Sequence, residues 1–117
     1  IRIIGEPKTI DNDLVLTDHT PGFGSAARYV ASTVREIVID ANVYETKSVT
    51  IVEIMGRHAG WLTAASALAR KHVGDNPLLI YLPETDFDQE AFLAKVSVYL
   101  REFMIRKVLL SVSMIIV

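Results

Sequence analysis

The sequence begins with the apolar run Ile1-Arg2-Ile3-Ile4-Gly5 and continues, after Glu6, into Pro7-Lys8-Thr9-Ile10-Asp11-Asn12-Asp13. The first run is short, rich in β-branched residues and ended by glycine, which is typical of a central parallel strand. The second run places carboxylates, an ammonium and a hydroxyl directly after it. Because open α/β sheets carry their sites at the carboxyl ends of strands, the two runs predict an α/β fold with a functional loop at this point.

The polar groups of this loop suit phosphoryl transfer from a small phosphate donor to a sugar hydroxyl. One carboxylate can accept the hydroxyl proton, while Lys8 and the Thr9 hydroxyl can stabilise charge on the moving phosphoryl group. An ordinary turn is the alternative, because Asp and Asn bond their own backbone and Lys is common on surfaces. The spacing of these residues by itself favours the turn.

Downstream of the loop, helix-like and strand-like patterns alternate along the chain. Apolar residues at helical spacing predict helices, and short β-branched or apolar runs predict strands. The expected elements are a helix over 21–41, a strand over 48–55, a helix over 58–72, a strand over 78–82, a helix from the capping residues at 85–89 to about 103, and a strand over 108–113. With the opening strand, this order predicts a three-layer α/β/α, Rossmann-like, mainly parallel sheet in a single unit over residues 1–117.

A second polar turn follows the strand expected over 48–55. Gly56 breaks the apolar pattern and permits a sharp turn or a close ligand. Arg57 then stands at the carboxyl end of the strand, where its planar fork of donors suits a phosphate. A surface arginine, with or without Glu53 as its partner, is the alternative, and the two interpretations are evenly matched on these residues.

Other titratable residues receive structural interpretations. His19, His58 and His72 lack the local spacing and the third clustered ligand that a zinc site needs. Glu84 and Asp86 could be taken for paired catalytic acids, but the start of the following helix explains them more simply.

Composition narrows the function classes. The chain has 117 residues, half of them hydrophobic, and a formal net charge of -2, so it lacks the basic excess of nucleic-acid-binding proteins. It contains no cysteine, which excludes disulfides and thiol catalysis and suits a cytoplasmic location. No secretory signal is recognised, and the apolar run over 108–117 is too short to cross a bilayer. We therefore expect neither a nucleic-acid partner nor a membrane partner.

The run Pro7–Asp13 resembles the PKTIDND signature of the phosphofructokinases, and Met55-Gly56-Arg57 resembles a second signature of that family. Thr17-Asp18, Gly22-Phe23 and the strand Val49–Ile54 are also similar to it. The similarity covers most of the chain, and two signatures in order are far more specific than either alone. It implies a partial phosphofructokinase fold, in which a truncated chain carries the catalytic loop and much of the fructose 6-phosphate-binding lobe.

The resemblance also implies roles for individual residues. Asp11 is implied to be the general base that removes the proton from the 1-hydroxyl of fructose 6-phosphate, with Lys8 and Thr9 stabilising the transition state. The implied substrate-binding residues are Thr9, Ile10, Asp11, Met55, Gly56 and Arg57. Mg²⁺ is the implied cofactor, and Asp13 is implied to help order it through water.

Lys8 bears on the phosphoryl donor. Many ATP-dependent bacterial members of the family have glycine at this position, whereas diphosphate-dependent members have lysine, a cation that can stabilise the leaving phosphate. The resemblance therefore favours a glycolytic transfer from diphosphate to fructose 6-phosphate, giving fructose 1,6-bisphosphate. Two alternatives stay open, namely an ATP-dependent 6-phosphofructokinase and a non-catalytic sugar-phosphate-binding or subunit-interaction fragment.

Parts of the family pattern are missing or changed. The glycine-rich donor loops and an upstream Mg²⁺ ligand have no counterpart, so we expect the isolated 117 residues to be inactive. Met114 stands where the family usually has a sugar-contacting glutamate. Ser48 stands near an arginine that, in ATP enzymes, reaches the neighbouring subunit's site, and Lys47 is a weak substitute for that charge. The family's oligomers imply a homo-oligomeric full-length enzyme.

Overall fold

The computed structural model describes the backbone of residues 1–102 and 107–112 and the side chains of residues 1–101. Its elements, in chain order, are α1 (Phe23–Ala41), β1 (Ser48–Glu53), α2 (Trp61–Ala65), the 3-10 helix η1 (Ser66–Ala69), β2 (Leu79–Tyr81), α3 (Gln89–Glu102) and β3 (Lys107–Val112). In this described part, no helix has the length and apolar character needed to cross a membrane.

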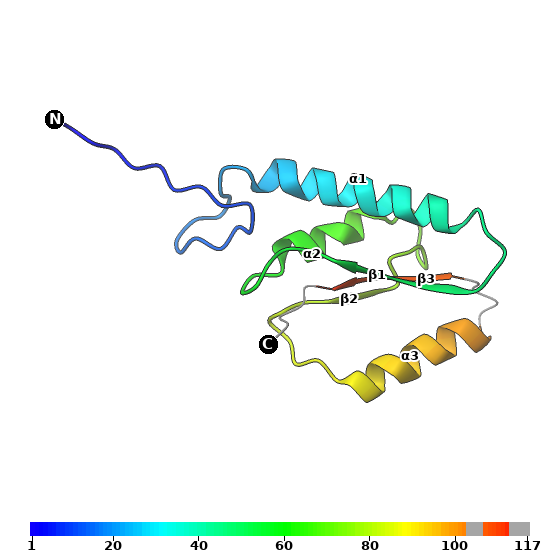
Figure 1. Cartoon of the computed structure of the whole chain (residues 1–117). Helices are drawn as coiled ribbons and strands as arrows, with labels where there is room; N and C mark the ends of the chain where they lie inside the picture. The colour runs from blue at the N-terminus through cyan, green and yellow to red at the C-terminus, as the bar shows by residue number, and fades with distance from the viewer. Residues whose placement is uncertain (103–106, 113–117) are drawn as a thin grey trace.

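The three strands form a parallel sheet in the order β1-β3-β2. In the register of the sheet, Ser48 of β1 lies opposite Lys107 and Leu79 of β2 lies opposite Leu110. Helices α1 and α2 cover one face, while α3 lies on the other (Figure 1). Because the strands are parallel, the chain leaves β1 and β2 at the same edge of the sheet.

The core lies between α1, α2 and the sheet. Val34 of α1 is 1% exposed and packs in a cluster with Ile54, directly after β1, and Leu62 of α2. The helix predicted over 21–41 is confirmed, except that it begins at Phe23. Gly22 has φ 96° at the N-cap, a left-handed conformation that glycine adopts without a Cβ clash.

The strand predicted at Ile1–Ile4 is wrong. Residues 1–8 form no strand, Ile1, Ile3 and Ile4 are almost fully exposed, and the segment projects away from the other elements (Figure 1, dark blue). A strand needs a hydrogen-bonded neighbour, and the three described strands pair only with one another. The pairing recorded in this region is an isolated parallel bridge between Thr9 and Gly22.

The helix predicted over 58–72 is wrong at both ends. Helix α2 begins at Trp61 after Gly60, and η1 ends at Ala69. Arg70 is already extended, with ψ 138°, and its Nε donates to the Pro77 carbonyl at 2.7 Å. The next two backbone N–H groups, of Lys71 and His72, donate to the Asp75 carboxylate at 2.9 and 2.8 Å. The side chain of Asp75 thus takes the donors that a longer helix would use.

The remaining boundaries differ by a few residues from those predicted. Strand β1 stops at Glu53, two residues short of the expected end. Helix α3 begins at Gln89, where Asp88 Oδ1 accepts the Ala91 N–H at 3.0 Å and caps the helix. The end expected at residue 103 and the strand end at Ser113 lie outside the described residues.

The loop over 9–13 is held to the start of α1 by Asn12 and Thr20. Asn12 is buried at φ 58°, and its Oδ1 accepts the Thr20 N–H at 2.8 Å. Its Nδ2 donates to the Asp18 carbonyl at 3.2 Å. The Thr20 hydroxyl, on a residue that is 1% exposed, donates to the Thr9 carbonyl at 2.8 Å. We call Asn12 and Thr20 the loop brace, because together they fix the backbone on both sides of Asp11.

Replacing the buried hydroxyl of the loop brace is expected to destabilise the fold. Thr20→Val keeps the side-chain shape but leaves the Thr9 carbonyl without its donor, which should lower the free energy of unfolding by about 1–3 kcal/mol. The control is Thr17→Val, which removes an exposed hydroxyl that donates to the Val15 carbonyl at 3.3 Å. This variant should change the free energy of unfolding by less than about 0.5 kcal/mol. Urea unfolding measures both, and equal effects of the two variants would contradict the prediction.

The stabilisation that Asp75 gives to its turn is expected to depend on pH. The N–H groups of Lys71 and His72 stabilise the carboxylate and lower the pKa of Asp75 from its ordinary value of 3.8. The stabilisation is therefore present above pH 3.8 and is lost as the pH falls through the lowered pKa. Asp75→Asn should lose less stability than the wild type on acidification in urea unfolding. Asp86→Asn is the control and should follow the wild type.

Candidate functional site

Asp11 occupies the centre of the braced loop. Its backbone N–H donates to the Thr9 hydroxyl oxygen at 3.1 Å, which curls the loop around the Thr9 side chain. The Asp11 side chain is half-buried, and its Oδ1 is a buried atom with no hydrogen-bond partner. A buried carboxylate oxygen without a donor is costly in a resting protein. An unpartnered oxygen of this kind is expected where a carboxylate accepts a proton from a bound ligand.

Lys8 extends across the start of α1. A Cβ atom placed on Gly22 would lie 3.1 Å from Lys8 Cε and 3.9 Å from Lys8 Nζ, so the lysine side chain passes directly over that glycine. The first turn of α1 contains no acidic residue to neutralise the ammonium. The Lys8 charge and the amino end of the helix dipole therefore add to a positive potential beside the loop.

The second turn leaves β1 at the carboxyl-end edge of the sheet. Gly56 is buried with φ 141°, a conformation that favours glycine, and Met55 and Arg57 on either side of it are exposed. Within the described part of the chain, Arg57 forms no ion pair with Glu53. The pairing with Glu53 is therefore not seen, while the exposed position of Arg57 fits a surface arginine, so its role in binding stays a prediction.

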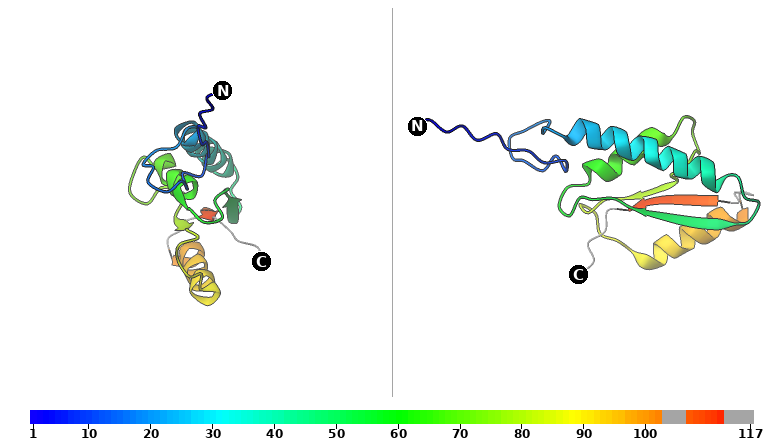
Figure 2. Two further views of the ribbon diagram at one scale, coloured as in Figure 1. Left: turned by 90° about the vertical axis from the view of Figure 1, so that its left-hand side faces the viewer. Right: turned by 45° about the horizontal axis from the view of Figure 1, so that its top comes forward.

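The two signature segments lie at the same end of the molecule in Figure 1 and in the right-hand view of Figure 2. Ile10 from the first and Met55 from the second line one cavity of about 290 Å³, together with residues of α1 and β1 such as Tyr29 and Val52. Lys8, Thr9, Asp11, Gly56 and Arg57 do not line this cavity. It is mostly apolar, so it joins the two segments structurally rather than forming a phosphate site.

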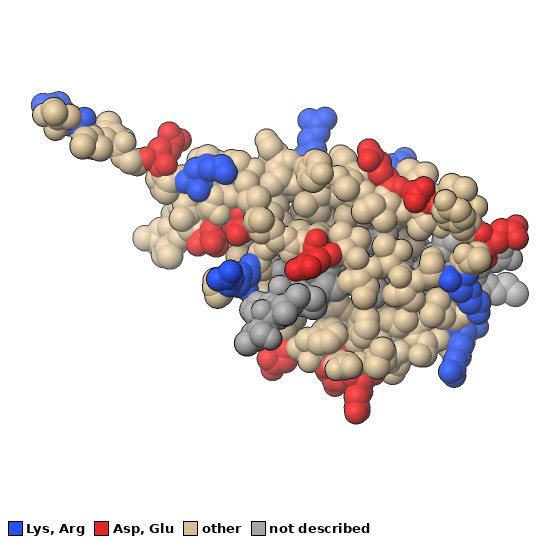
Figure 3. All heavy atoms as spheres, viewed as in Figure 1, with Lys and Arg blue, Asp and Glu red and all other residues tan. Residues whose placement is uncertain are grey.

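Charges of both signs gather at this end. Figure 3 shows Lys or Arg side chains beside Asp or Glu side chains on the surface over the loop and the second turn. Lys8, Asp13 and Arg57 are all exposed. Among the described residues, no group of three or more His, Asp or Glu side chains is placed to hold a metal. Asp13 and Asp11 of this loop therefore belong to no cluster of three such ligands in the described part of the chain.

His19 and Lys47 make contacts of a structural kind. His19 packs edge-on against the Phe23 ring, with ring centroids 5.2 Å apart. Lys47 Nζ donates to the Leu100 carbonyl near the end of α3 at 2.8 Å, at the opposite edge of the sheet from the loop. This contact gives Lys47 a helix-capping role and does not place it for a phosphate. Met114 lies outside the described residues.

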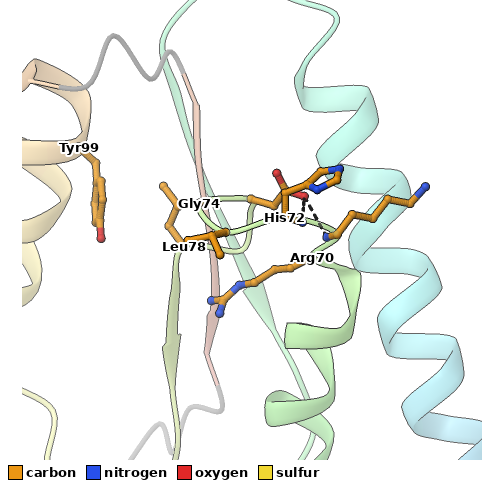
Figure 4. Close-up of a pocket in the computed structure, with 8 residues that line it drawn as sticks. Arg70, His72, Gly74, Leu78 and Tyr99 are labelled. Carbon is orange, nitrogen blue, oxygen red and sulfur yellow. Dashed lines mark hydrogen bonds between the residues drawn. The ribbon is translucent and has the colours of Figure 1, made fainter.

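A second and larger cavity, of about 560 Å³, lies at the amino end of β2 (Figure 4). Its lining includes Arg70, His72, Asp75 and Tyr99. None of the residues expected to act on a substrate lines it. Arg70 is held by the Pro77 carbonyl through both Nε and Nη2, and Asp75 by two backbone N–H groups. These charged groups already have structural partners.

Three residues near the site were missed by the sequence analysis. Asn12 stands inside the first signature and tolerates a left-handed backbone, which was the available signal for its bracing role. Thr20 gives no signal, since a buried and an exposed threonine look alike in sequence. Glu84 was assigned to a helix start, yet its Oε1 accepts the Gly60 N–H at 2.7 Å, beside the second turn.

Comparison with known proteins agrees with this geometry. The family model described as Phosphofructokinase matches residues 1–116. The chain is 58% identical over 98 residues to a protein of Xanthomonas campestris named pyrophosphate–fructose 6-phosphate 1-phosphotransferase, covering 82% of this chain and 23% of that one. A Halomonas elongata protein of the same name is 51% identical over 98 residues, again covering 82% of this chain and 23% of its own length. The chain thus spans about a quarter of these relatives.

A solved structure shows the same fold. The crystal structure of a pyrophosphate-dependent phosphofructokinase from Marinobacter aquaeolei superposes with a TM-score of 0.83 at 41% identity, covering 92% of this chain and 27% of that one. A more distant relative, an ATP-dependent 6-phosphofructokinase of Streptomyces coelicolor, is 38% identical over 96 residues, covering 82% of this chain and 26% of that one. Because the family model matches nearly every residue of this chain, the chain belongs to the phosphofructokinase family.

Proposed function

We propose that this chain supplies the catalytic loop and the fructose 6-phosphate-binding part of a diphosphate-dependent 6-phosphofructokinase. The observation that carries the proposal is the buried, unpartnered Oδ1 of Asp11 in a braced loop that follows Lys8 and Thr9. The 58% identity to a relative named for this reaction supports the choice of donor. Residues 1–117 would form a single unit, the three-layer Rossmann-like lobe that receives the sugar phosphate.

In the proposed reaction, Asp11 accepts the proton of the 1-hydroxyl of fructose 6-phosphate. The freed oxygen forms a bond to the terminal phosphorus of diphosphate, the bond from that phosphorus to the bridging oxygen breaks, and phosphate leaves with the electron pair. The proton then passes from Asp11 to solvent or to the departing phosphate. Phosphoryl transfer needs little covalent help, so orientation and charge stabilisation supply most of the rate.

Lys8 and Thr9 would act on the moving phosphoryl group and the leaving phosphate. The ammonium of Lys8 lies beside the amino end of α1, where helix dipole and side-chain charge have the same sign. An anion in this position would be stabilised by both. Diphosphate lacks a nucleoside to supply binding energy. A cation at this position would therefore contribute a larger share of the binding energy for diphosphate than for ATP.

Arg57 would bind the phosphate of the acceptor, and Met55 and Gly56 would shape the turn that receives the sugar, with Thr9 and Ile10 on the facing loop. The exposed Arg57 guanidinium is not engaged by Glu53, so its donors are available to a ligand. Its place at the carboxyl end of β1 is the usual position of a ligand in an α/β sheet.

Mg²⁺ fits the chain only as a cofactor shared with the donor. Asp13 is exposed on the catalytic loop, and a site with few protein carboxylates suits an ion that keeps several waters and takes its other ligands from phosphates. When bound, Mg²⁺ would neutralise charge on diphosphate. Asp13 would help to order one of its waters, and Asp11 would keep its own role as the base.

An ATP-dependent enzyme is the second candidate, because the chain is 38% identical to a relative named as ATP-dependent. That identity is lower than the 58% to the relative named for diphosphate. A non-catalytic sugar-phosphate-binding or subunit-interaction protein is the third, since the chain spans about a quarter of the relatives that carry the named activity. We further propose a cytoplasmic location and a homo-oligomeric full-length enzyme, as the family resemblance implies.

The donor assay tests the proposed function directly. Phosphoryl transfer to fructose 6-phosphate with Mg²⁺ is measured for the longest chain that contains these residues, with diphosphate or ATP as donor. We expect activity with diphosphate, and Lys8→Ala should raise the KM for diphosphate more than that for fructose 6-phosphate. Activity with ATP alone would overturn the donor, and a folded protein active with neither would support the non-catalytic alternative.

Variants of the two signature segments should separate chemistry from acceptor binding. Asp11→Asn removes the base and should lower kcat by about 10²- to 10⁴-fold with little change in KM. Arg57→Ala removes charged donors to the acceptor and should raise the KM for fructose 6-phosphate by about tenfold or more. Steady-state kinetics distinguish the two. An equal loss of kcat with unchanged KM values in both variants would be incompatible with these roles.

A further inference from the structure

The start of α2 and the end of β2 are in unusually close contact. A Cβ atom on Gly60 would lie 2.7 Å from Glu84 Oε2, 2.9 Å from Pro83 Cδ and 3.0 Å from Leu82 Cδ2. Contacts below 3.0 Å are essentially never made by real Cβ atoms. Gly60 has φ -87°, so the glycine is required by this close approach and not by its backbone conformation.

One hydrogen bond joins the two segments at this contact. Glu84 Oε1 accepts the Gly60 N–H at 2.7 Å, a short charge-assisted bond. Gly60 precedes α2, so its N–H belongs to the group of helix-start donors that need an acceptor from outside the helix. A negative charge is also favourable at a helix start. Glu84 therefore supplies an acceptor to the start of α2 from the turn that follows β2.

Glu84 itself is held in place by its neighbours. The rings of Tyr81, at the end of β2, and Phe87 are edge-on with centroids 5.2 Å apart, so the chain between them forms a closed loop. Both rings also contact Phe92 of α3, at 5.8 and 5.5 Å. The carboxylate thus projects from a segment anchored to the aromatic cluster on both sides.

The hydrogen bond acts on the segment that carries Arg57. Residues 54–60 between β1 and α2 contain no regular structure, and the chain is fixed before them by buried Ile54 and after them by buried Leu62. At Gly60 this turn is hydrogen-bonded to the segment that follows β2. Since β1 and β2 end at the same edge of the parallel sheet, Glu84 can reach the turn from beside it.

We propose that Glu84 is a positioning residue, which holds the turn over 55–60 in the shape that presents Arg57 to the acceptor phosphate. The proposal rests on the proposed function, because it assigns Glu84 to the acceptor side of that reaction. It predicts an effect on the binding of fructose 6-phosphate and not on the donor, since Lys8 and the loop brace lie against the start of α1, whereas Glu84 is bonded to Gly60 before α2.

The test measures transfer kinetics in the longest chain that contains these residues. Glu84→Ala should raise the KM for fructose 6-phosphate about tenfold and change the KM for diphosphate by less than about twofold. Glu84→Gln keeps an acceptor for the Gly60 N–H and should remain within about threefold of the wild type. Asp86→Ala, which removes a nearby carboxylate with no recorded hydrogen bond, is the matched control and should behave as the wild type.

A second readout does not depend on activity. Hydrogen–deuterium exchange of a peptide covering 55–62 should quicken in Glu84→Ala and not in Glu84→Gln, while a peptide within α1 stays unchanged. If Glu84→Ala does not fold, Glu84→Asp, which keeps the charge but is one methylene too short to reach the Gly60 N–H, should reproduce both effects.

Three results would overturn the inference. These are unchanged KM and exchange in Glu84→Ala, an equal rise in both KM values, or a Glu84→Gln variant as impaired as Glu84→Ala. A wild type that transfers phosphoryl groups from neither donor would instead refute the proposed function. In that case the exchange experiment still decides whether Glu84 holds the turn.

Discussion

The burial of Val34 between Ile54 and Leu62 is the contact on which the arrangement of this chain depends. It joins α1 to the end of β1 and to α2, and each of these elements adjoins one of the two signature segments. The first segment is tied to the start of α1 through the Thr9–Gly22 bridge, and the second follows β1 directly. This apolar cluster, against which Ile10 of the first segment also packs, therefore helps to set the relative position of the two polar loops.

The sequence predicted elements well where packing is repetitive. The long amphipathic pattern of α1 and the β-branched run of β1 were recognised because many side chains repeat the same signal. The prediction of a strand at Ile1–Ile4 was wrong because an apolar run indicates a preference for burial but does not indicate that a partner strand is present. The helix over 58–72 failed because single polar contacts, from Glu84 to Gly60 and from Asp75 to two N–H groups, end it early.

The candidate site was predictable to the same degree. Its chemical groups were visible in the signatures, since Asp11, Lys8 and Arg57 are the residue types that proton and phosphate transfer require. The groups that position them were not visible. Thr20 and Glu84 act through hydrogen bonds across 11 and 24 positions of sequence, and no local pattern marks such partners. Sequence thus indicates which groups react, while the geometry that holds them depends on tertiary contacts.

The strand order has a consequence for how this chain is made. The central strand β3 is the last of the three in sequence, and β1 and β2 pair with it but not with each other. During synthesis the ribosome therefore releases β1 more than fifty residues before its only hydrogen-bonding neighbour among the described strands can follow. Until then the backbone N–H and C=O groups of β1 that pair with β3 stay available to other chains, a setting in which nascent polypeptides aggregate or recruit chaperones. Translation speed through the α3 region would then influence the yield of correctly folded protein.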